Sequence, residues 1–199
     1  DNIDEKWDYE IGIRTEHTAN NGSVKNLNVD FANSYINLFP NVTIGYALSD
    51  NQSISLSYSK RINRPSLGQL NPFTDITDSL TQRSGNPALF PEISNSIELG
   101  FSRNVRKGSI LAKLYYRNSK NSILPFTILR PDGVLFSQPL NAGTTETIGF
   151  ETIFFYDIFR LWKTNWSASI FNQNIDANNI QADVLKKVLS WNTKWINDF

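Results

Sequence analysis

The chain repeats one pattern, in which apolar residues occupy every second position over short segments and polar residues fill the positions between them. Between residues 53 and 59, Ile54, Leu56 and Tyr58 alternate with four serines. Successive side chains of an extended strand point to opposite faces, so this spacing predicts a strand with one apolar and one hydroxyl-bearing face.

The same period of two recurs along the chain and predicts about eight strands, each near the roughly 9–11 residues that a tilted transmembrane strand needs. The apolar positions of the other segments are Trp7, Tyr9, Ile11 and Ile13; Val42, Ile44, Tyr46 and Leu48; Ile97, Leu99 and Phe101; Ile110, Ala112, Leu114 and Tyr116; Ile148, Phe150, Phe154, Tyr156 and Ile158; Trp166, Ala168 and Ile170; and Leu189, Trp191 and Trp195.

Short and long connections alternate between the predicted strands. The tight connections are residues 49–52, 104–108 and 159–163, and the long ones lie near residues 17–40, 64–92, 121–143 and 173–184. This alternation is typical of an outer-membrane barrel, with tight turns at one end and long external loops at the other. A soluble β-sandwich places long connections at both ends. The pattern favours an all-β, antiparallel, up-and-down transmembrane β-barrel and leaves the soluble fold open.

Composition narrows the alternatives. The chain has 19 basic and 19 acidic residues and no basic run, so nucleic acid is not an expected partner. It has no cysteine, which excludes disulfides and thiolate metal sites. It also has no methionine, so we expect a processed protein or a piece of a longer one. No segment approaches the roughly 20 consecutive apolar residues of a transmembrane helix.

Catalytic chemistry is not indicated. His17 is the single histidine, and neither a cysteine nor a Gly-x-Ser-x-Gly segment is present to supply a nucleophile. Asp75, Asp78 and the polar residues of 172–178 have the oxygen-rich spacing that calcium accepts, but no glycine or bidentate glutamate completes either set. The sequence therefore predicts no enzyme, no cofactor and no metal site.

Several motifs occur in an order that resembles a known family. They are Gly12–Glu16, Leu38–Val42, Tyr58–Pro65, Leu70–Phe73, Gly85–Glu92, Asn141–Gly143 and Gly149–Glu151. Together they resemble the barrel of TonB-dependent outer-membrane receptors, most closely the outer-membrane β-barrel family abundant in Bacteroidetes. The segment from Arg61 to Glu92 is the most specific part of the resemblance.

The resemblance implies a bacterial outer-membrane location and energised uptake of a scarce solute, such as a siderophore or a glycan. In that family the motifs sit in a barrel of about 22 strands behind a plug domain. By this resemblance, residues 1–199 are a partial barrel domain that lacks the plug, the early strands and the closing strands. The implied partners are outer-membrane lipid, the protein's own plug, TonB and a surface lipoprotein.

Three alternatives remain open from the sequence. Eight strands can close into a small barrel on their own. An outer-membrane barrel can also serve structure or surface assembly without transport. The third alternative is a soluble β-sandwich that binds carbohydrate through exposed aromatic residues.

Two groups of residues are candidates for a site. The first group consists of candidate ligand contacts in and beside the predicted long loop of residues 64–92: Arg61, Asn63, Arg64, Asn71, Phe73, Arg83 and Asn86. The alternative role of these residues is to hold the loop over the barrel mouth, since Arg64-Pro65 and Asn71-Pro72 stiffen the chain. The polar face of the strands contains the second group, predicted to line a lumen and touch the plug: Glu98, Lys113, Arg117 and Glu151.

Overall fold

The computed structural model describes residues 6–24, 29–159, 162–180 and 185–198. The elements are β1 (Trp7–Val24), β2 (Val29–Ser49), β3 (Gln52–Asn63), α1 (Leu67–Leu70), β4 (Thr81–Arg83), β5 (Glu92–Val105), β6 (Gly108–Leu129), β7 (Leu135–Phe159), β8 (Trp162–Asp176) and β9 (Leu185–Asp198). Among the described residues, no helix has the length and hydrophobicity needed to cross a membrane.

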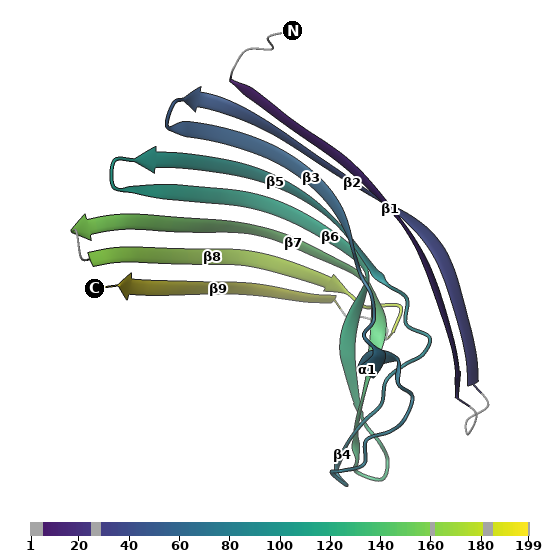
Figure 1. Ribbon diagram of the computed structural model, residues 1–199. Coiled ribbons are helices and arrows are strands. Elements are labelled where there is room, and N and C mark those ends of the chain that lie inside the picture. Colours follow the sequence, from purple (N-terminus) through teal and green to yellow (C-terminus); the bar gives the residue numbers. More distant parts are fainter. Residues whose placement is uncertain (1–5, 25–28, 160–161, 181–184, 199) are drawn as a thin grey trace.

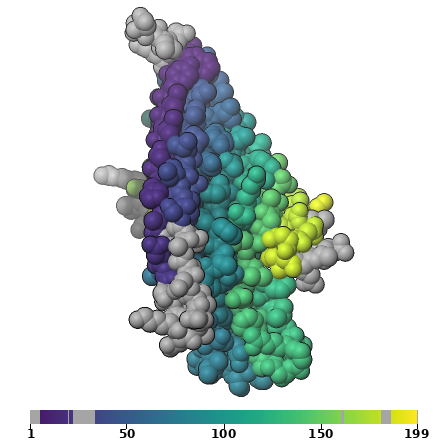
Figure 2. All heavy atoms as spheres, turned by 90° about the vertical axis from the view of Figure 1, so that its right-hand side faces the viewer, coloured from purple at the N-terminus to yellow at the C-terminus, as the bar shows by residue number. Residues whose placement is uncertain are grey.

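Eight long strands form one curved sheet in the order β1-β2-β3-β5-β6-β7-β8-β9, and every neighbouring pair is antiparallel (Figure 1). The space-filling view shows the same order, from the purple N-terminal strand towards the yellow C-terminal strand (Figure 2). Chain order and spatial order coincide, so the predicted up-and-down arrangement of about eight strands is confirmed. A β-sandwich would need a second sheet packed on the first, and the described strands form a single sheet.

One face of the sheet, here named the outer face, is apolar from edge to edge. A register row of large apolar side chains, each at least partly open to its surroundings, crosses all eight strands: Tyr9, Ile44, Leu56, Leu99, Leu114, Phe150, Ile170 and Trp191. A water-soluble protein rarely exposes so continuous an apolar surface. The outer face therefore suits a hydrocarbon environment.

From β3 to β9, a polar row ends this apolar surface at the end of the sheet where the long connections lie, whereas on β2 the exposed side chains of Leu38 and Ile36 continue it. The polar row consists of Lys60, Asn95, Asn118, Glu146, Asn174 and Lys187. From Lys60 to Gln52, at the opposite end of β3, the strand covers roughly 26 Å at about 3.3 Å per residue. These nine residues are at the lower end of the roughly 9–11 residues that a tilted strand needs to cross the apolar band of an outer membrane.

The opposite, inner face is polar and carries small side chains. The row next to the apolar one reads Asp8, Gly45, Ser55, Gly100, Lys113, Glu151, Ser169 and Asn192. Few apolar side chains of the described residues are buried: Phe39, Leu89, Tyr115, Ala142 and Ala177. The sheet has almost no core of its own, as expected for one layer between lipid and a polar interior.

The tight turns are staggered in a regular way. Gln52, which follows the first tight turn, pairs in register with Arg103. From there β5 continues two residues further, to Val105, before the second tight turn. Gly108, which follows the second tight turn, pairs in register with Tyr156. From there β7 continues three residues further, to Phe159, before the third tight turn. A stagger of two to three residues in the same direction tilts the strands, and this is the geometry by which a sheet closes into a barrel.

The prediction of a long loop is wrong for two segments. Residues 17–40 are not one loop, because β1 continues to Val24 and β2 begins at Val29. Residues 121–143 likewise form a hairpin, in which β6 reaches Leu129 and β7 starts at Leu135. These hairpin extensions run past the polar row, where neither face needs to be apolar, so the alternation that predicts membrane strands is absent from them.

Candidate functional site

The connection between β3 and β5, residues 64–91, folds into a compact loop that we name the strap. It contains α1, which Ser66 and Gln69 cap reciprocally: the Gln69 N–H donates to Ser66 Oγ (3.3 Å), and the Ser66 N–H donates to Gln69 Oε1 (2.9 Å). The returning limb then bonds to the outgoing one, with Gly85 N donating to Asn71 O (2.8 Å) and Asn86 N donating to Gln69 O (2.6 Å). The strap is therefore closed on itself by backbone hydrogen bonds.

The strap is fixed to the extension of β7. The short strand β4 pairs in parallel with Leu135–Ser137. Further along, Gln138 Nε2 donates to Gly85 O (2.9 Å), and Asn86 Nδ2 donates to Pro139 O (3.2 Å). These contacts follow one edge of the β6–β7 extension, so strap and extension form one unit (Figure 1).

Asn141 joins three connections at the same end of the sheet. Its side-chain amide accepts from Phe90 N (2.8 Å) and donates to Phe90 O (2.9 Å) and Asn121 O (2.8 Å). Its backbone carbonyl accepts from Asn179 Nδ2 (2.7 Å), which lies beyond the end of β8. Asn121 itself adopts a positive φ of 57°, a conformation that asparagine tolerates better than most residues.

Replacing Asn141 with aspartate is expected to free the returning limb of the strap. The carboxylate keeps the size of the amide, but it cannot donate and it faces the carbonyls of Phe90 and Asn121. Losing these hydrogen bonds costs about 1–3 kcal/mol locally, so amide hydrogen exchange at Phe90 should become roughly ten- to hundredfold faster. Asn104→Asp, in β5 beside a tight turn at the other end of the sheet, is the control. Unchanged exchange at Phe90 would contradict the role of Asn141.

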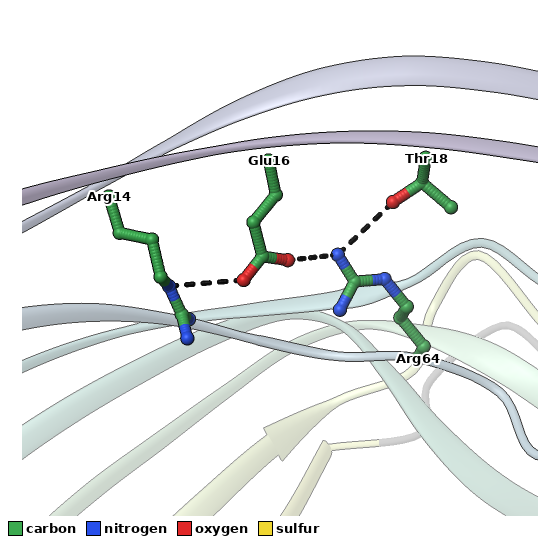
Figure 3. Close-up of polar contacts among 4 residues, drawn as sticks. All are labelled: Arg14, Glu16, Thr18 and Arg64. Atoms are coloured by element: carbon green, nitrogen blue, oxygen red, sulfur yellow. Dashed lines mark hydrogen bonds and ion pairs between the residues drawn. The ribbon is translucent and has the colours of Figure 1, made fainter.

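On its opposite side the strap meets β1 through Arg64. The Arg64 guanidinium pairs with Glu16 and donates from Nη2 to Thr18 Oγ1 (3.1 Å), while Arg14 Nε lies 3.0 Å from the other Glu16 oxygen (Figure 3). The hydrogen bond from Arg64, helped by the charges of Arg14 and Arg64, lowers the pKa of the Glu16 carboxyl below its usual value. Glu16 is thus ionised at neutral pH and holds the strap against β1.

A cavity of about 900 Å³ lies between the strap and the β1–β2 extension. Side chains of the strap line it with apolar surface: Pro65, Leu67, Leu70, Pro72, Phe73, Pro87, Leu89, Phe90 and Pro91. The β1–β2 extension contributes Ser34, Tyr35 and Asn37 on the other side. An apolar cavity of this size with a few polar groups has the general character of a small-molecule site.

The structure brings only some of the predicted ligand residues to this cavity. Arg64, Asn71 and Phe73 line it. Asn71 and Phe73 also line a second cavity of about 480 Å³, which contains Arg83.

The remaining three predicted loop residues lie elsewhere. Arg61 lines a third cavity of about 370 Å³. Asn63 is the last residue of β3 and pairs in register with Glu92, and Asn86 bonds the strap to Pro139. Asn86 thus supports the loop, and five of the seven predicted residues line cavities, whereas contact with a ligand stays a prediction.

The four polar residues predicted for the lumen lie on the inner face. Lys113 Nζ is 3.0 Å from Glu98 Oε2, and Lys113 is opposite Glu151 in the register of β6 and β7. Arg117 stands over the ring of Tyr115, with its guanidinium carbon 5.6 Å from the ring centroid. They form one charged band in the middle of the sheet; contact with a plug stays a prediction.

Several residues of the site were not predicted. Glu16 and Thr18, which bind Arg64, are 48 and 46 residues away from it, and no local pattern links them. Tyr35 is also not among the predicted site residues, because its segment has the sequence of a loop. The capping box of α1 was recognisable in principle, since Ser66 and Gln69 have the Ser-x-x-Gln spacing.

The residues considered for catalysis or calcium have local structural contacts. His17 Nε2 lies 3.1 Å from Ser34 Oγ across the β1–β2 pair. Asp75 and Asp176 each accept a hydrogen bond from the backbone two residues further on, as turn residues do. Within the described ranges, no three His, Asp or Glu side chains gather as metal ligands would.

Solved structures with a similar fold are outer-membrane proteins. The siderophore receptor PirA from Pseudomonas aeruginosa is 16% identical, with a TM-score of 0.62, over 98% of this chain and 38% of that one. The copper transporter OprC is 16% identical, with a TM-score of 0.68, over 87% and 27%. The ferric yersiniabactin uptake receptor FyuA from Yersinia pestis is 17% identical, with a TM-score of 0.57, over 89% and 26%. This chain thus spans less than two fifths of each structure.

A comparison with curated proteins finds no significant match. The profile of the outer membrane protein beta-barrel family, in contrast, matches residues 1–199. The fold confirms the resemblance to TonB-dependent receptor barrels, and the apolar outer face is the surface that such a barrel presents to lipid. The chain belongs to the outer membrane protein beta-barrel family, and its place is the bacterial outer membrane.

Proposed function

We propose that this chain is a wall and loop segment of a TonB-dependent receptor that takes up a scarce solute, and that the strap captures the solute. The observation that carries the proposal is the cavity of about 900 Å³ between the strap and the β1–β2 extension. It lies at the long-loop end of the sheet, which is the external end of an outer-membrane barrel. Siderophores and copper, named for the similar structures, are candidate solutes, and a glycan is another.

The segment is proposed to be part of a larger barrel with a plug. Among the described strands, β1 and β9 each pair on one side only, and unpaired strand edges are not tolerated in lipid. The similar structures are more than twice as long as this chain. Further strands would complete the wall, the inner face would surround the plug, and TonB would supply the energy. A surface lipoprotein is a further proposed partner.

Deleting the strap from the full-length receptor tests the proposal. Asn63 and Glu92 lie opposite each other in register, so a two-residue turn can replace residues 64–91 without disturbing the wall. We expect at least tenfold weaker solute binding and loss of uptake, with a normally folded barrel. The solute is identified beforehand by growth and binding assays on siderophores, haem, copper and neutral glycans.

Two comparisons make this experiment specific. A matched variant replaces residues 131–133, the tip of the β6–β7 turn, with a two-residue turn; it keeps Arg130, whose Nη1 donates to Gln82 Oε1 of the strap (3.3 Å), and should bind normally. Wild-type receptor in cells without TonB should bind solute but not transport it. Unchanged binding after strap deletion would reject the strap as the capture site. A receptor that binds and transports none of these solutes would favour the alternative of a barrel that serves structure or surface assembly.

A further inference from the structure

The wall of the sheet opens into a fork between β2 and β3. Pairing of these strands stops at Asn41 and Ser59, whereas β1–β2 continues to Val24 and Val29 (Figure 1). The first residue of β2 beyond this pair, towards the long-loop end, is Pro40. Proline has no backbone N–H and therefore suits a strand edge that loses its partner. The β1–β2 pair leaves the sheet at this point.

A cavity of about 370 Å³ occupies the fork, and its charged lining is entirely basic. Arg14, Lys60 and Arg61 line it together with Phe39, and no carboxylate is among its lining residues. The guanidinium carbon of Arg14 lies 5.1 Å from the centroid of the Phe39 ring. Among the described residues, the ion pairs include neither Lys60 nor Arg61.

The nearby acid does not neutralise this charge. Glu16 contacts Arg14 (Nε to Oε1, 3.0 Å), but it also pairs with Arg64 of the strap. One carboxylate is thus shared by two guanidinium groups, and no acidic side chain in the described part of the chain forms an ion pair with Lys60 or Arg61. Such a cluster is stable when an anion occupies it, since like charges repel at short range.

The position of the fork indicates where the anion comes from. Lys60 follows Leu56 and Tyr58 on the outer face and belongs to the polar row that ends the apolar band. Ile13, also on the outer face, lines the same cavity. The other six lining residues, Arg14 and Arg61 among them, belong to the inner face, so residues from both faces of the wall line the cavity at the fork. This is the level at which the headgroup of an outer-leaflet lipid lies.

We propose that the fork is a binding site for the phosphate group of an outer-leaflet lipid. Guanidinium and ammonium groups bind phosphate through charge-assisted hydrogen bonds. Basic pockets between membrane-spanning elements recognise lipid headgroups by the same chemistry. The acyl chains would lie along the apolar outer face below Lys60. The lipid would then fill the notch that the missing β2–β3 pairing leaves in the wall.

Native mass spectrometry of the full-length receptor, incubated with bisphosphorylated lipid A, tests this site. Lys60→Gln/Arg61→Gln is expected to retain at least tenfold less lipid than wild type. The matched control is Lys120→Gln/Lys187→Gln, which removes two exposed cations from the outer face outside the fork. Both variants must show the heat-modifiable migration of a folded barrel. Dephosphorylated lipid A, used as a second probe, should be retained poorly by all three proteins.

Three outcomes would overturn the proposal. Equal lipid retention by the fork variant and wild type would show that Lys60 and Arg61 do not bind the headgroup. An equal loss in the control variant would show non-specific attraction to surface charge. Displacement of the lipid by millimolar inorganic phosphate, together with equal retention of dephosphorylated lipid A, would assign the fork to a soluble anion instead.

Discussion

Replacing Gly85 with alanine is expected to unfold the strap and to weaken solute capture about a hundredfold, while the barrel itself still assembles. A Cβ atom at this position would lie 2.5 Å from Asn71 O, 2.6 Å from Gln69 O and 2.7 Å from Asn71 N. All three are backbone atoms, so no side chain can rotate away. Forced overpacking of this kind costs up to about 3 kcal/mol, which corresponds to a factor of roughly 100.

The same strap offers a matched control. A Cβ added to Gly68, in α1, would meet no atom within 4 Å, so Gly68→Ala should bind solute as wild type does. The measurement is solute binding by the full-length receptor, with limited proteolysis to detect an unfolded strap. Equal binding by the two alanine variants would show that the closed strap is not required for capture.

Gly85 shows how far local sequence can predict this site. The segment Gly85-Asn86-Pro87 predicts a turn, and the chain does turn there. The reason why only glycine fits is different: the backbone of Gln69 and Asn71, more than ten residues earlier, packs against it. A close approach between two distant segments leaves no periodic signal in either of them.

The strands were predictable where the membrane imposes a difference between their two faces. Leu56 and Leu114, for example, alternate with a serine or a lysine, because one side meets lipid and the other does not. Past the polar row both sides are free to be polar. The extensions up to Val24 and Leu129 therefore resemble loops in sequence, although their backbones continue to pair.

Long-range partners were the least predictable part of the site. The sequence predicts Arg64 as a candidate ligand contact because it lies in a stiff, polar loop, and Arg64 does line the main cavity. Its pairing with Glu16 depends on the β1–β2 extension, which the sequence did not reveal. The prediction thus located the strap correctly but could not supply the opposite wall of the cavity.

In the membrane-spanning part of the sheet, Gly149→Val is expected to destabilise the barrel by about 3 kcal/mol. Tyr115 is only 8% exposed, although it lies on the inner face of a single-layer sheet. It is opposite Gly149 in register, and its ring covers that glycine, because a Cβ there would be 2.5 Å from Tyr115 Cζ and 2.8 Å from Phe171 Cβ. An aromatic ring over a strand glycine shields the exposed backbone.

Urea unfolding and heat-modifiable migration of the full-length receptor measure this effect. Gly45→Val is the matched control on the same inner face, since a Cβ at Gly45 would make ordinary contact with Asp8 Cβ at 3.4 Å. In a Tyr115→Ala background, Gly149→Val should cost clearly less stability than it does in the wild type, because the ring with which valine collides is absent and only the contact with Phe171 Cβ remains. An equal cost in both backgrounds would show that Tyr115 is not the partner that requires glycine at position 149.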